Sequence, residues 1–181
     1  VWIQSSSLCS GYLDQDDEFK SQRLGSWFFT GDMGFIKDNE LYISGRYKDV
    51  MIVDSKKYFS ADLEQRVWSI IGHDKHVKKV VVVGAGAIGG NEAISVCIEW
   101  LDFFPLISFH QRREFRKKII HSFKNQINLS KNDIHFTGIR SLDRTTSDKL
   151  KRYLIRTKIQ KKQIKNSMWS IFWRSWFFGF R

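Results

Sequence analysis

The stretch WFFTGDMGFIKDNELYISGRYKDVMIV, from Trp27 to Val53, decides the fold. Its central part has two runs of alternating apolar and polar residues on either side of Asp38-Asn39. A dipeptide of this type favours a tight turn, and alternation with a period of two is typical of strands. The sequence therefore predicts a β-hairpin here. Together with the strand-like VWIQ at the start, it makes residues 1 to about 45 rich in β-structure.

A helix is expected to follow, opening at Ser60 in the segment SADLEQRVWSIIG. Ser60 suits the N-cap, the acidic residues after it suit the first turn, and Gly72 suits the C-terminal stop. The apolar side chains of this segment recur at helical spacing and predict one buried face: Leu63, Val67, Ile70 and Ile71.

The rest of the chain alternates between strand-like and helix-like patterns. Two strand-like runs, VKKVVVV and AISVCIEW, come first, and the segment DIHFTGI predicts a shorter strand. Between them a second helix is expected from about His110 to Ile127, with its apolar residues inward: Phe115, Ile119, Ile120 and Phe123. A polar loop, SLDRTTSDKLKR, then leads into a basic helix. The second half thus predicts a small α+β unit of about 110 residues.

The segment VVVVGAGAIGG, from Val80 to Gly90, spells the G-x-G-x-x-G of a dinucleotide-binding turn. Such a turn needs a helix directly after its glycines and an acid about 20 residues further on. Here the next residues, NEAISVCIEW, alternate like a strand, and Asp102 follows that strand. We therefore interpret the glycines as part of a hairpin between two strands.

The 181-residue chain has a net charge of +11, and the charge is concentrated near its end. Between Arg140 and Lys165 there are ten Lys and Arg residues against two acids, so this segment carries +8. Such a segment suits nucleic acid, an anionic membrane or a phosphate-bearing substrate, and it is equally typical of a solvated helix face.

Two cysteines without metal-type spacing favour a reducing compartment, here the cytoplasm. No apolar run reaches the ~20 residues that a membrane-spanning helix needs. The first residue is Val1, inside a strand-like run, so we expect the chain to begin within a longer protein.

Two further segments carry a specific resemblance. Thr30-Gly31-Asp32 and the Gly-Arg-Tyr-Lys-Asp run of residues 45–49 lie in the opening stretch, and LDRTTSDKLKR follows about 100 residues later. They resemble the core motifs and the catalytic loop, L-P-K-T-S-S-G-K-I-Q-R, of adenylate-forming enzymes, the superfamily of acyl-CoA synthetases, luciferases and fatty acyl-AMP ligases. The segments ELYISGR and SSSLCSGY are most similar to the corresponding sequences of fatty acyl-AMP ligases.

The resemblance implies an α+β fold. Residues 1–47 would be the β-rich end of a large N-terminal domain, residues 48–165 a mobile C-terminal α+β domain, and residues 166–181 an aromatic tail. Lys48 stands where the family has the hinge about which the small domain swings.

The resemblance also implies a reaction and its residues. A fatty acid and ATP, with Mg²⁺, would give acyl-AMP and pyrophosphate, and the acyl group would pass to coenzyme A or an acyl carrier protein. Asp32 would accept hydrogen bonds from the ribose hydroxyls, Arg46 would donate near the ribose and phosphate, and Lys149 would bridge the acyl carboxylate and the nucleotide. No residue of the chain is assigned as a metal ligand.

Three residues depart from the family pattern. Asp148 replaces the glycine before the catalytic lysine, so it is expected to cost backbone strain and to place a carboxylate beside Lys149. Asp143 stands where a proline is usual, and Ser55 replaces a glycine in the loop after residues 51–53. These changes bear on the placement of Lys149 and on the second half-reaction.

The phosphate-gripping loop and the acyl pocket of this family would precede Val1, so the chain alone is expected not to make acyl-adenylate. The alternative is a non-catalytic remnant that binds a carrier protein, a membrane or nucleic acid through its basic C-terminal face, with nucleic acid the least favoured partner. The tail from Ser167 to Arg181 has its aromatic residues on one helical face, which suits an interfacial membrane contact, docking on another domain, or an incidental extension of a truncated reading frame.

Overall fold

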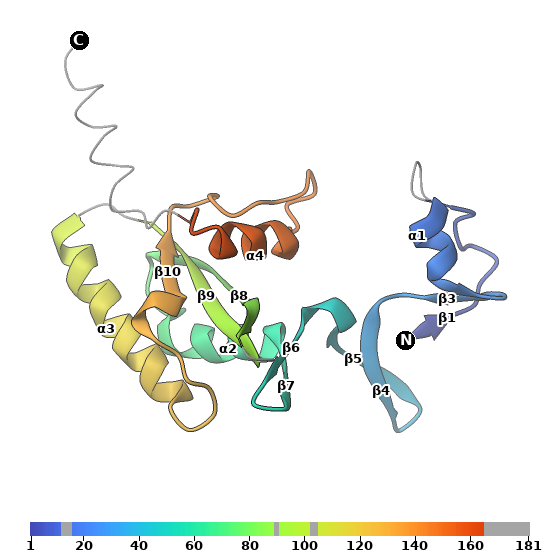
Figure 1. Cartoon of the computed structure of the whole chain (residues 1–181), viewed down its shortest axis with the longest axis horizontal. Coiled ribbons are helices and arrows are strands. Elements are labelled where there is room, and N and C mark those ends of the chain that lie inside the picture. The colour runs from blue at the N-terminus through green and yellow to red at the C-terminus, as the bar shows by residue number, and fades with distance from the viewer. Residues whose placement is uncertain (12–15, 89–90, 102–104, 165–181) are drawn as a thin grey trace, which may run out of the picture. The chain divides into compact units, whose positions relative to one another are not determined.

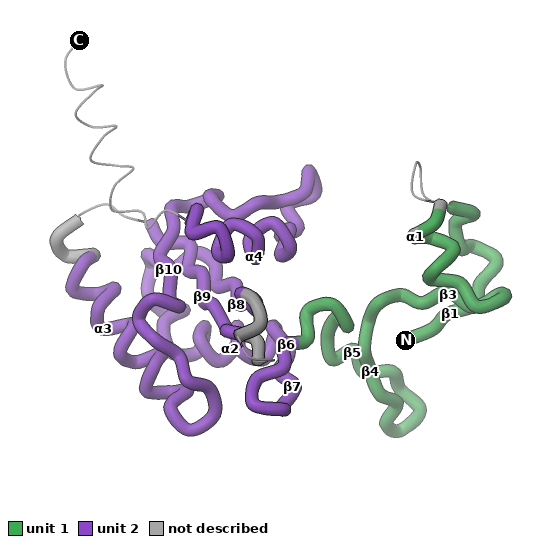
Figure 2. Tube along the Cα trace, viewed as in Figure 1, with its two compact units in different colours: residues 1–50 green, residues 51–181 purple. Residues whose placement is uncertain are grey.

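The computed structural model describes residues 1–11, 16–88, 91–101 and 105–164. The chain divides into two compact units, Val1–Val50 and Met51–Arg181 (Figure 2). The predicted tail of residues 166–181 lies outside the described residues.

The first unit is built from short strands. Its elements are β1 (Trp2–Ile3), α1 (Asp16–Ser21), β2 (Arg23–Leu24), β3 (Trp27–Phe29), β4 (Asp32–Lys37), β5 (Glu40–Arg46) and the 3₁₀ turn η1 (Tyr47–Asp49). Strands β1, β3 and β2 form an antiparallel sheet in that order, and β4 pairs with β5 (Figure 1).

The predicted hairpin is confirmed in β4 and β5, which pair antiparallel from Asp32 and Arg46 to Lys37 and Glu40. Its turn residues, Asp38 and Asn39, have φ values of 50° and 62°. Two successive residues with positive φ make the turn type whose twist matches that of the paired strands. Asn and Asp tolerate this conformation better than most residues, so the local sequence favours the turn.

The second unit is a three-stranded sheet with helices on both faces. Its elements are β6 (Val50–Val53), which starts at the unit boundary, β7 (Lys56–Phe59), α2 (Ser60–Ile71), β8 (Val77–Ile88), β9 (Asn91–Trp100), α3 (Pro105–Phe123), the 3₁₀ turn η2 (Lys131–Asp133), β10 (Ile134–Thr137) and α4 (Arg152–Gln160). The sheet order is β10-β9-β8, with β8 antiparallel and β10 parallel to β9. Strands β6 and β7 form a separate hairpin.

Alternate residues of the sheet enter two different apolar clusters. On one face, side chains such as Val82, Val96 and Phe136 pack with Leu63 of α2 and Ile119 of α3 in the larger cluster. The other face is buried by the smaller cluster, and burial on both faces explains why β8 and β9 have near-continuous apolar runs.

On the other face, the smaller cluster joins the sheet to α4. Val81, Val83 and Cys97 pack with Leu142 of the preceding loop and with Ile155 of α4. Figure 1 shows α4 and α2 on opposite sides of the sheet. The loop that leads into α4 is therefore anchored on the face that α2 and α3 leave open.

The glycine segment is a hairpin, as predicted from its flanks. Gly84 pairs with Ile94 and Ile88 with Asn91, within one antiparallel ladder that extends to Val77 and Trp100. The ladder is irregular between Gly84 and Ala87, and residues 89–90 lie outside the described part. Because a strand follows the glycines, they do not open the helix that a dinucleotide-binding turn requires.

Two predicted helix boundaries were wrong. Ser60 is the first helical residue and Phe59 the N-cap, one position earlier than expected. The second helix runs from Pro105 to Phe123 instead of from about 110 to 127. Proline suits a first helical position because it lacks the amide that would stay unpaired there. The buried Ile127 lies just after the turn that follows the helix, so its burial extended the apolar pattern beyond the helix end.

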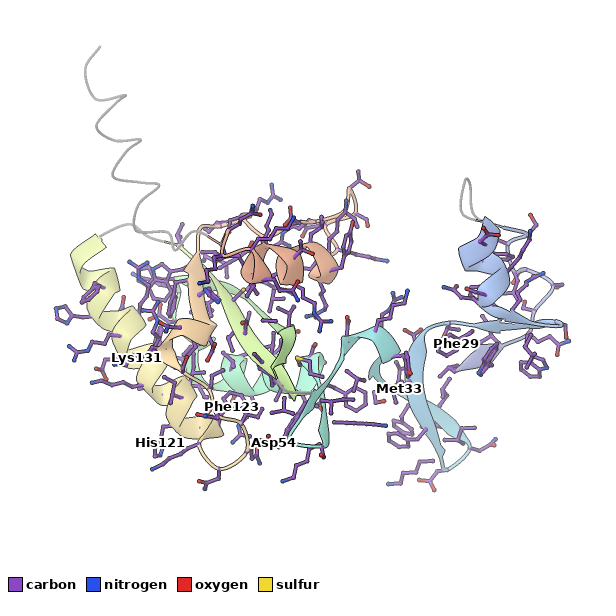
Figure 3. The ribbon with its side chains drawn as sticks, viewed as in Figure 1. Phe29, Met33, Asp54, His121, Phe123 and Lys131 are labelled. Atoms are coloured by element: carbon purple, nitrogen blue, oxygen red, sulfur yellow. The ribbon has the colours of Figure 1, made fainter. Side chains whose placement is uncertain are left out.

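Replacing Ser55 by glycine is expected to stabilise the second unit by up to about 1 kcal/mol, the difference between the cost of a left-handed residue and the entropy of glycine. The β6–β7 turn has φ values of 48° at Asp54 and 63° at Ser55, and Asp54 lies at its tip (Figure 3). The slowest amide exchange rates of β8 and β9 measure the change. Ser69→Gly, in the interior of α2, is the matched control and should destabilise by a similar amount. Equal signs for the two variants would contradict the strain at Ser55.

Candidate functional site

Asp32 and Arg46 lie opposite each other at the open end of the β4–β5 hairpin. The Nε of Arg46 is 3.3 Å from the Oδ1 of Asp32. Their side chains are 69% exposed for Arg46 and 31% exposed for Asp32. The register of one hairpin thus brings together two of the residues that the sequence analysis singled out.

The Thr-Gly-Asp motif has a local structural reason. The hydroxyl of Thr30 accepts a hydrogen bond from the amide of Asp32 at 3.0 Å, which fixes the start of β4. Gly31 has a φ of 77°, and its carbonyl accepts a hydrogen bond from the amide of Tyr47 at 2.8 Å. Gly31 therefore permits the left-handed bend that places Asp32 beside the end of β5.

An exposed ion pair of this kind contributes little to folding, because water screens it and both side chains lose freedom. The Asp32 carboxylate can accept two hydrogen bonds, and the guanidinium of Arg46 keeps several donors for a second group. The pair is therefore suited to bind a polar ligand that offers hydroxyl groups and negative charge.

Lys48 lies in the single 3₁₀ turn Tyr47–Asp49, between β5 and β6. The division between the two compact units falls after Val50, two residues further along the chain. A short connection of this type is where a change of backbone angles would reorient the parts that it joins.

Lys149 lies in the second unit, in a small hairpin loop of residues 143–151. Arg144 and Leu150 form an isolated antiparallel bridge that closes the loop. The amide of Thr145 donates to the carbonyl of Lys149 at 2.7 Å, and the amide of Lys149 donates to the hydroxyl of Thr145 at 3.0 Å. The backbone of Lys149 is thus ordered, while its side chain is exposed.

Asp148 adopts a φ of 62°, which confirms the strain expected where the family has glycine. Its carboxylate lies 3.3 Å from the guanidinium of Arg144. Among the described residues, no ion pair includes Lys149. The negative charge next to the lysine is therefore balanced by Arg144.

Asp143, which stands where the family has proline, is also paired. Its carboxylate lies 2.7 Å from the Nζ of Lys158 on α4, and its carbonyl accepts a hydrogen bond from the amide of Lys151 at 2.8 Å. Asp143 and Asp148, the two acids that depart from the family pattern, therefore both form ion pairs with basic residues of the same segment.

Glu99 and Arg144 were missed as candidates by the sequence analysis. Glu99 is only 2% exposed on β9, and its Oε2 lies 2.6 Å from the Nη2 of Arg144. The signal was a single acid inside the otherwise uncharged run ISVCIEW, because a carboxylate is buried only when it has a partner.

The comparisons with curated proteins point to one kind of enzyme. The putative fatty-acid–CoA ligase FadD21 of Mycobacterium tuberculosis is 32% identical over 84 residues, which cover 40% of this chain and 14% of that protein. The medium-chain-fatty-acid–[acyl-carrier-protein] ligase JamA of Moorena producens is 35% identical over 75 residues, 37% of this chain and 13% of that protein. A 4-hydroxyphenylalkanoate adenylyltransferase of Mycobacterium marinum is 23% identical over 84% of this chain and 26% of its own length.

Among solved structures, a fatty acyl-adenylate ligase from a study of the E. coli and L. pneumophila enzymes superimposes with a TM-score of 0.68. The match has 22% identity and covers 89% of this chain and 27% of the other. The chain thus resembles a part of fatty acid-activating ligases in sequence and a part of fatty acyl-adenylate ligases in fold. No family model matches the chain.

The resemblance to adenylate-forming enzymes and the small α+β fold were both predicted from the sequence and are confirmed. The chain spans about a seventh of the length of FadD21 and about a quarter of the longer matches. The matched part of an adenylate-forming enzyme is therefore a minor share of the whole protein.

Three other properties of the described residues concern metal binding, membrane crossing and cysteine reactivity. They contain no group of three or more His, Cys, Asp or Glu side chains placed to hold a metal ion. No helix in the described ranges combines the length and the apolar character needed to cross a bilayer. Burial raises the pKa of the Cys97 thiol to about 12, so this cysteine stays protonated and unreactive at neutral pH.

Proposed function

We propose that this chain is the C-terminal part of an ATP-dependent ligase that activates a fatty acid as acyl-AMP. The pairing of Asp32 with Arg46 at the end of the β4–β5 hairpin is the observation that carries the proposal. The names of FadD21 and JamA support a fatty acid as the substrate class.

In the first step, a carboxylate oxygen of the fatty acid attacks the α-phosphorus of ATP, the bond to the pyrophosphate oxygen breaks, and pyrophosphate leaves. In the second step, a thiol sulfur attacks the acyl carbonyl of acyl-AMP and AMP leaves, while the thiol proton passes to solvent. The first step brings together two negatively charged groups, so positioning and charge neutralisation supply most of its catalysis.

Asp32 and Arg46 fit the nucleotide in this scheme. The carboxylate of Asp32 accepts hydrogen bonds from the two ribose hydroxyls, and Arg46 donates toward the ribose and phosphate oxygens. Their exposure and mutual distance support these roles, since both groups are accessible and their ion pair is weak enough to rearrange. Mg²⁺ accompanies ATP through its phosphate oxygens, and no residue of this chain is proposed as its ligand.

Lys149 supplies the mobile positive charge at the reacting oxygens. A lysine ammonium suits this task because it is compact and sits on a flexible stem. Its ordered backbone and exposed side chain support the role. Lys48 is the hinge between the parts that carry Asp32 and Lys149, and residues 48–165 form the domain that moves.

The acceptor of the second step is a thiol, either of coenzyme A or of an acyl carrier protein. FadD21 is named for the first type of acceptor and JamA for the second. The basic segment around α4 suits an acceptor that carries negative charge, such as the phosphates of coenzyme A.

Replacing Asp32 by alanine is expected to raise the KM for ATP by about 10- to 100-fold, because hydrogen bonds to a charged group contribute roughly 1.5–3 kcal/mol. The change is measured as ATP–pyrophosphate exchange in the longest natural polypeptide that contains this chain. Asp38→Ala is the control, because it removes an acid from the turn at the far end of the same hairpin. An unchanged KM for ATP in Asp32→Ala would contradict the role of this residue in nucleotide binding.

A further inference from the structure

The carboxylate of Glu99 is among the most buried charged groups of the second unit. Glu99 lies on β9, the central strand of the sheet, and is 2% exposed. Its Oε1 accepts a hydrogen bond from the amide of Leu142 at 3.4 Å, and its Oε2 lies 2.6 Å from Arg144. A buried carboxylate is tolerated only when such partners compensate for its lost hydration.

Arg144 connects this buried carboxylate to the loop of Lys149. One terminal nitrogen of its guanidinium, Nη2, bonds Glu99, and the other, Nη1, lies 3.3 Å from the carboxylate of Asp148. The side chain of Arg144 is 17% exposed, and that of Asp148 is 68% exposed. A planar guanidinium presents its donors in a fixed fork, so it holds two carboxylates at a defined separation.

The two contacts differ in strength. The exposed contact with Asp148 contributes little energy by itself, because water screens it. The buried contact with Glu99 is much harder to break, because its loss leaves a carboxylate without its cation in the interior. The bridge Glu99–Arg144–Asp148, here called the Arg144 bridge, is therefore anchored in the sheet and reaches the residue directly before Lys149.

The backbone conformation of Asp148 explains why a contact at this residue affects the loop. A residue at φ 62° has a lower intrinsic preference for its conformation than glycine, so the loop needs an additional restraint to stay in this form. The amide of Asp148 donates to the carbonyl of Thr145 at 3.0 Å, and the adjacent amide of Lys149 donates to the hydroxyl of the same threonine. Both hydrogen bonds lie within the turn that Asp148 closes, next to its contact with Arg144.

We propose that Glu99 and Arg144 are positioning residues that fix the loop from which Lys149 projects. Glu99 holds the guanidinium of Arg144, and Arg144 holds the backbone turn at Asp148. This inference deepens the proposed function and rests on it only for the catalytic consequence, since the restraint on the loop is a property of the folded chain.

Hydrogen exchange in the 181-residue chain tests the restraint without any activity. In Arg144→Gln, the amides of Asp148 and Lys149 are expected to exchange at least about tenfold faster, and the exchange of Val81 and Val83 in β8 reports separately how far the loss of the partner of Glu99 destabilises the whole unit. Arg144→Lys, which retains one charged contact, should restore part of the protection. If the first variant fails to fold, Asp148→Asn tests the exposed end of the bridge, where only an increase of about two- to fivefold in the exchange of the Lys149 amide is expected, because water screens that contact.

Arg66→Gln is the matched control, because Arg66 also makes hydrogen bonds through its guanidinium but on the α2–α3 face, to Gln126 and Ser122. It should leave the exchange of the loop amides unchanged. Loop amides that exchange at the wild-type rate in a folded Arg144→Gln would overturn the proposal, whatever the enzyme does.

A second readout separates this inference from the proposed function. In the longest natural polypeptide that contains the chain, Arg144→Gln should lower kcat for adenylation by about 10- to 100-fold and change the KM for ATP less than about threefold, as expected for misplacement of a catalytic group. Faster loop exchange with an unchanged kcat would overturn the positioning role. If the loop amides exchange faster in Arg144→Gln but Lys149→Ala keeps full activity, the proposed role of Lys149 is wrong and the restraint on the loop still holds.

Discussion

Replacing Lys149 by alanine is expected to lower the rate of acyl-adenylate formation by about two to three orders of magnitude, the loss typical of one preorganised charge-stabilising group. The reacting carboxylate and the α-phosphate repel each other, and the ammonium of Lys149 is proposed to neutralise that charge as the bond forms. The KM for ATP should change much less, because Asp32 and Arg46 are proposed to hold the nucleotide. Single-turnover formation of acyl-AMP measures the chemical step directly.

The stability of the second unit should be unaffected by this change. The side chain of Lys149 is exposed, and its backbone hydrogen bonds with Thr145 remain available to alanine. Lys161→Ala is the control, because Lys161 is an exposed lysine of the same basic segment at the end of α4. It should keep the wild-type rate. Equal losses in both variants would point to net charge as the cause and would contradict a specific role for Lys149.

Replacing Trp100 by alanine is expected to destabilise the second unit by about 3–5 kcal/mol, a large part of the stability of an ordinary domain. Trp100 is 1% exposed at the end of β9. Its ring stacks with His76 at a centroid distance of 5.2 Å and forms T-shaped pairs with Phe115 and Phe136 at centroid distances of 5.8 and 5.6 Å. Truncation would leave a cavity between the sheet and α3 and would remove these contacts.

Trp100→Phe separates packing from the polar part of the indole. The Nε1 of Trp100 is buried and has no hydrogen-bond partner among the described residues, so its removal costs nothing in hydrogen bonding. This variant should therefore lose only about 1–2 kcal/mol, the cost of a smaller aromatic ring in the same place. The exchange of the slowest amides in β8 and β9 measures both values. Similar losses for alanine and phenylalanine would contradict the packing argument.

The features that depend on local chemistry were predictable from the sequence. The β4–β5 turn followed from Asp38-Asn39, and the strand after the glycine segment excluded a dinucleotide site. The pairing of Asp32 with Arg46 follows from the register of that one hairpin. In each case the deciding residues are neighbours in the chain or face each other across a short turn, so pattern and turn chemistry are sufficient.

The Arg144 bridge could not be predicted in the same way. Glu99 and Arg144 are 45 positions apart and meet only because the loop before α4 packs on the second face of the sheet. The end of α3 was misplaced for a related reason, since the burial of Ile127 depends on the core and not on the helix. Long-range packing decides both, and no local pattern encodes it.

The central claim, that this chain serves a fatty acid-activating ligase, is tested most directly by detecting acyl-AMP by mass spectrometry. The longest natural polypeptide that contains the chain is incubated with ATP, Mg²⁺ and medium- or long-chain fatty acids. Acyl-AMP is expected to form only when a fatty acid is present, and the 181-residue chain alone is expected to form none. A folded polypeptide that carries the intact Asp32, Arg46 and Lys149 and makes no acyl-AMP from any of these acids would contradict the claim.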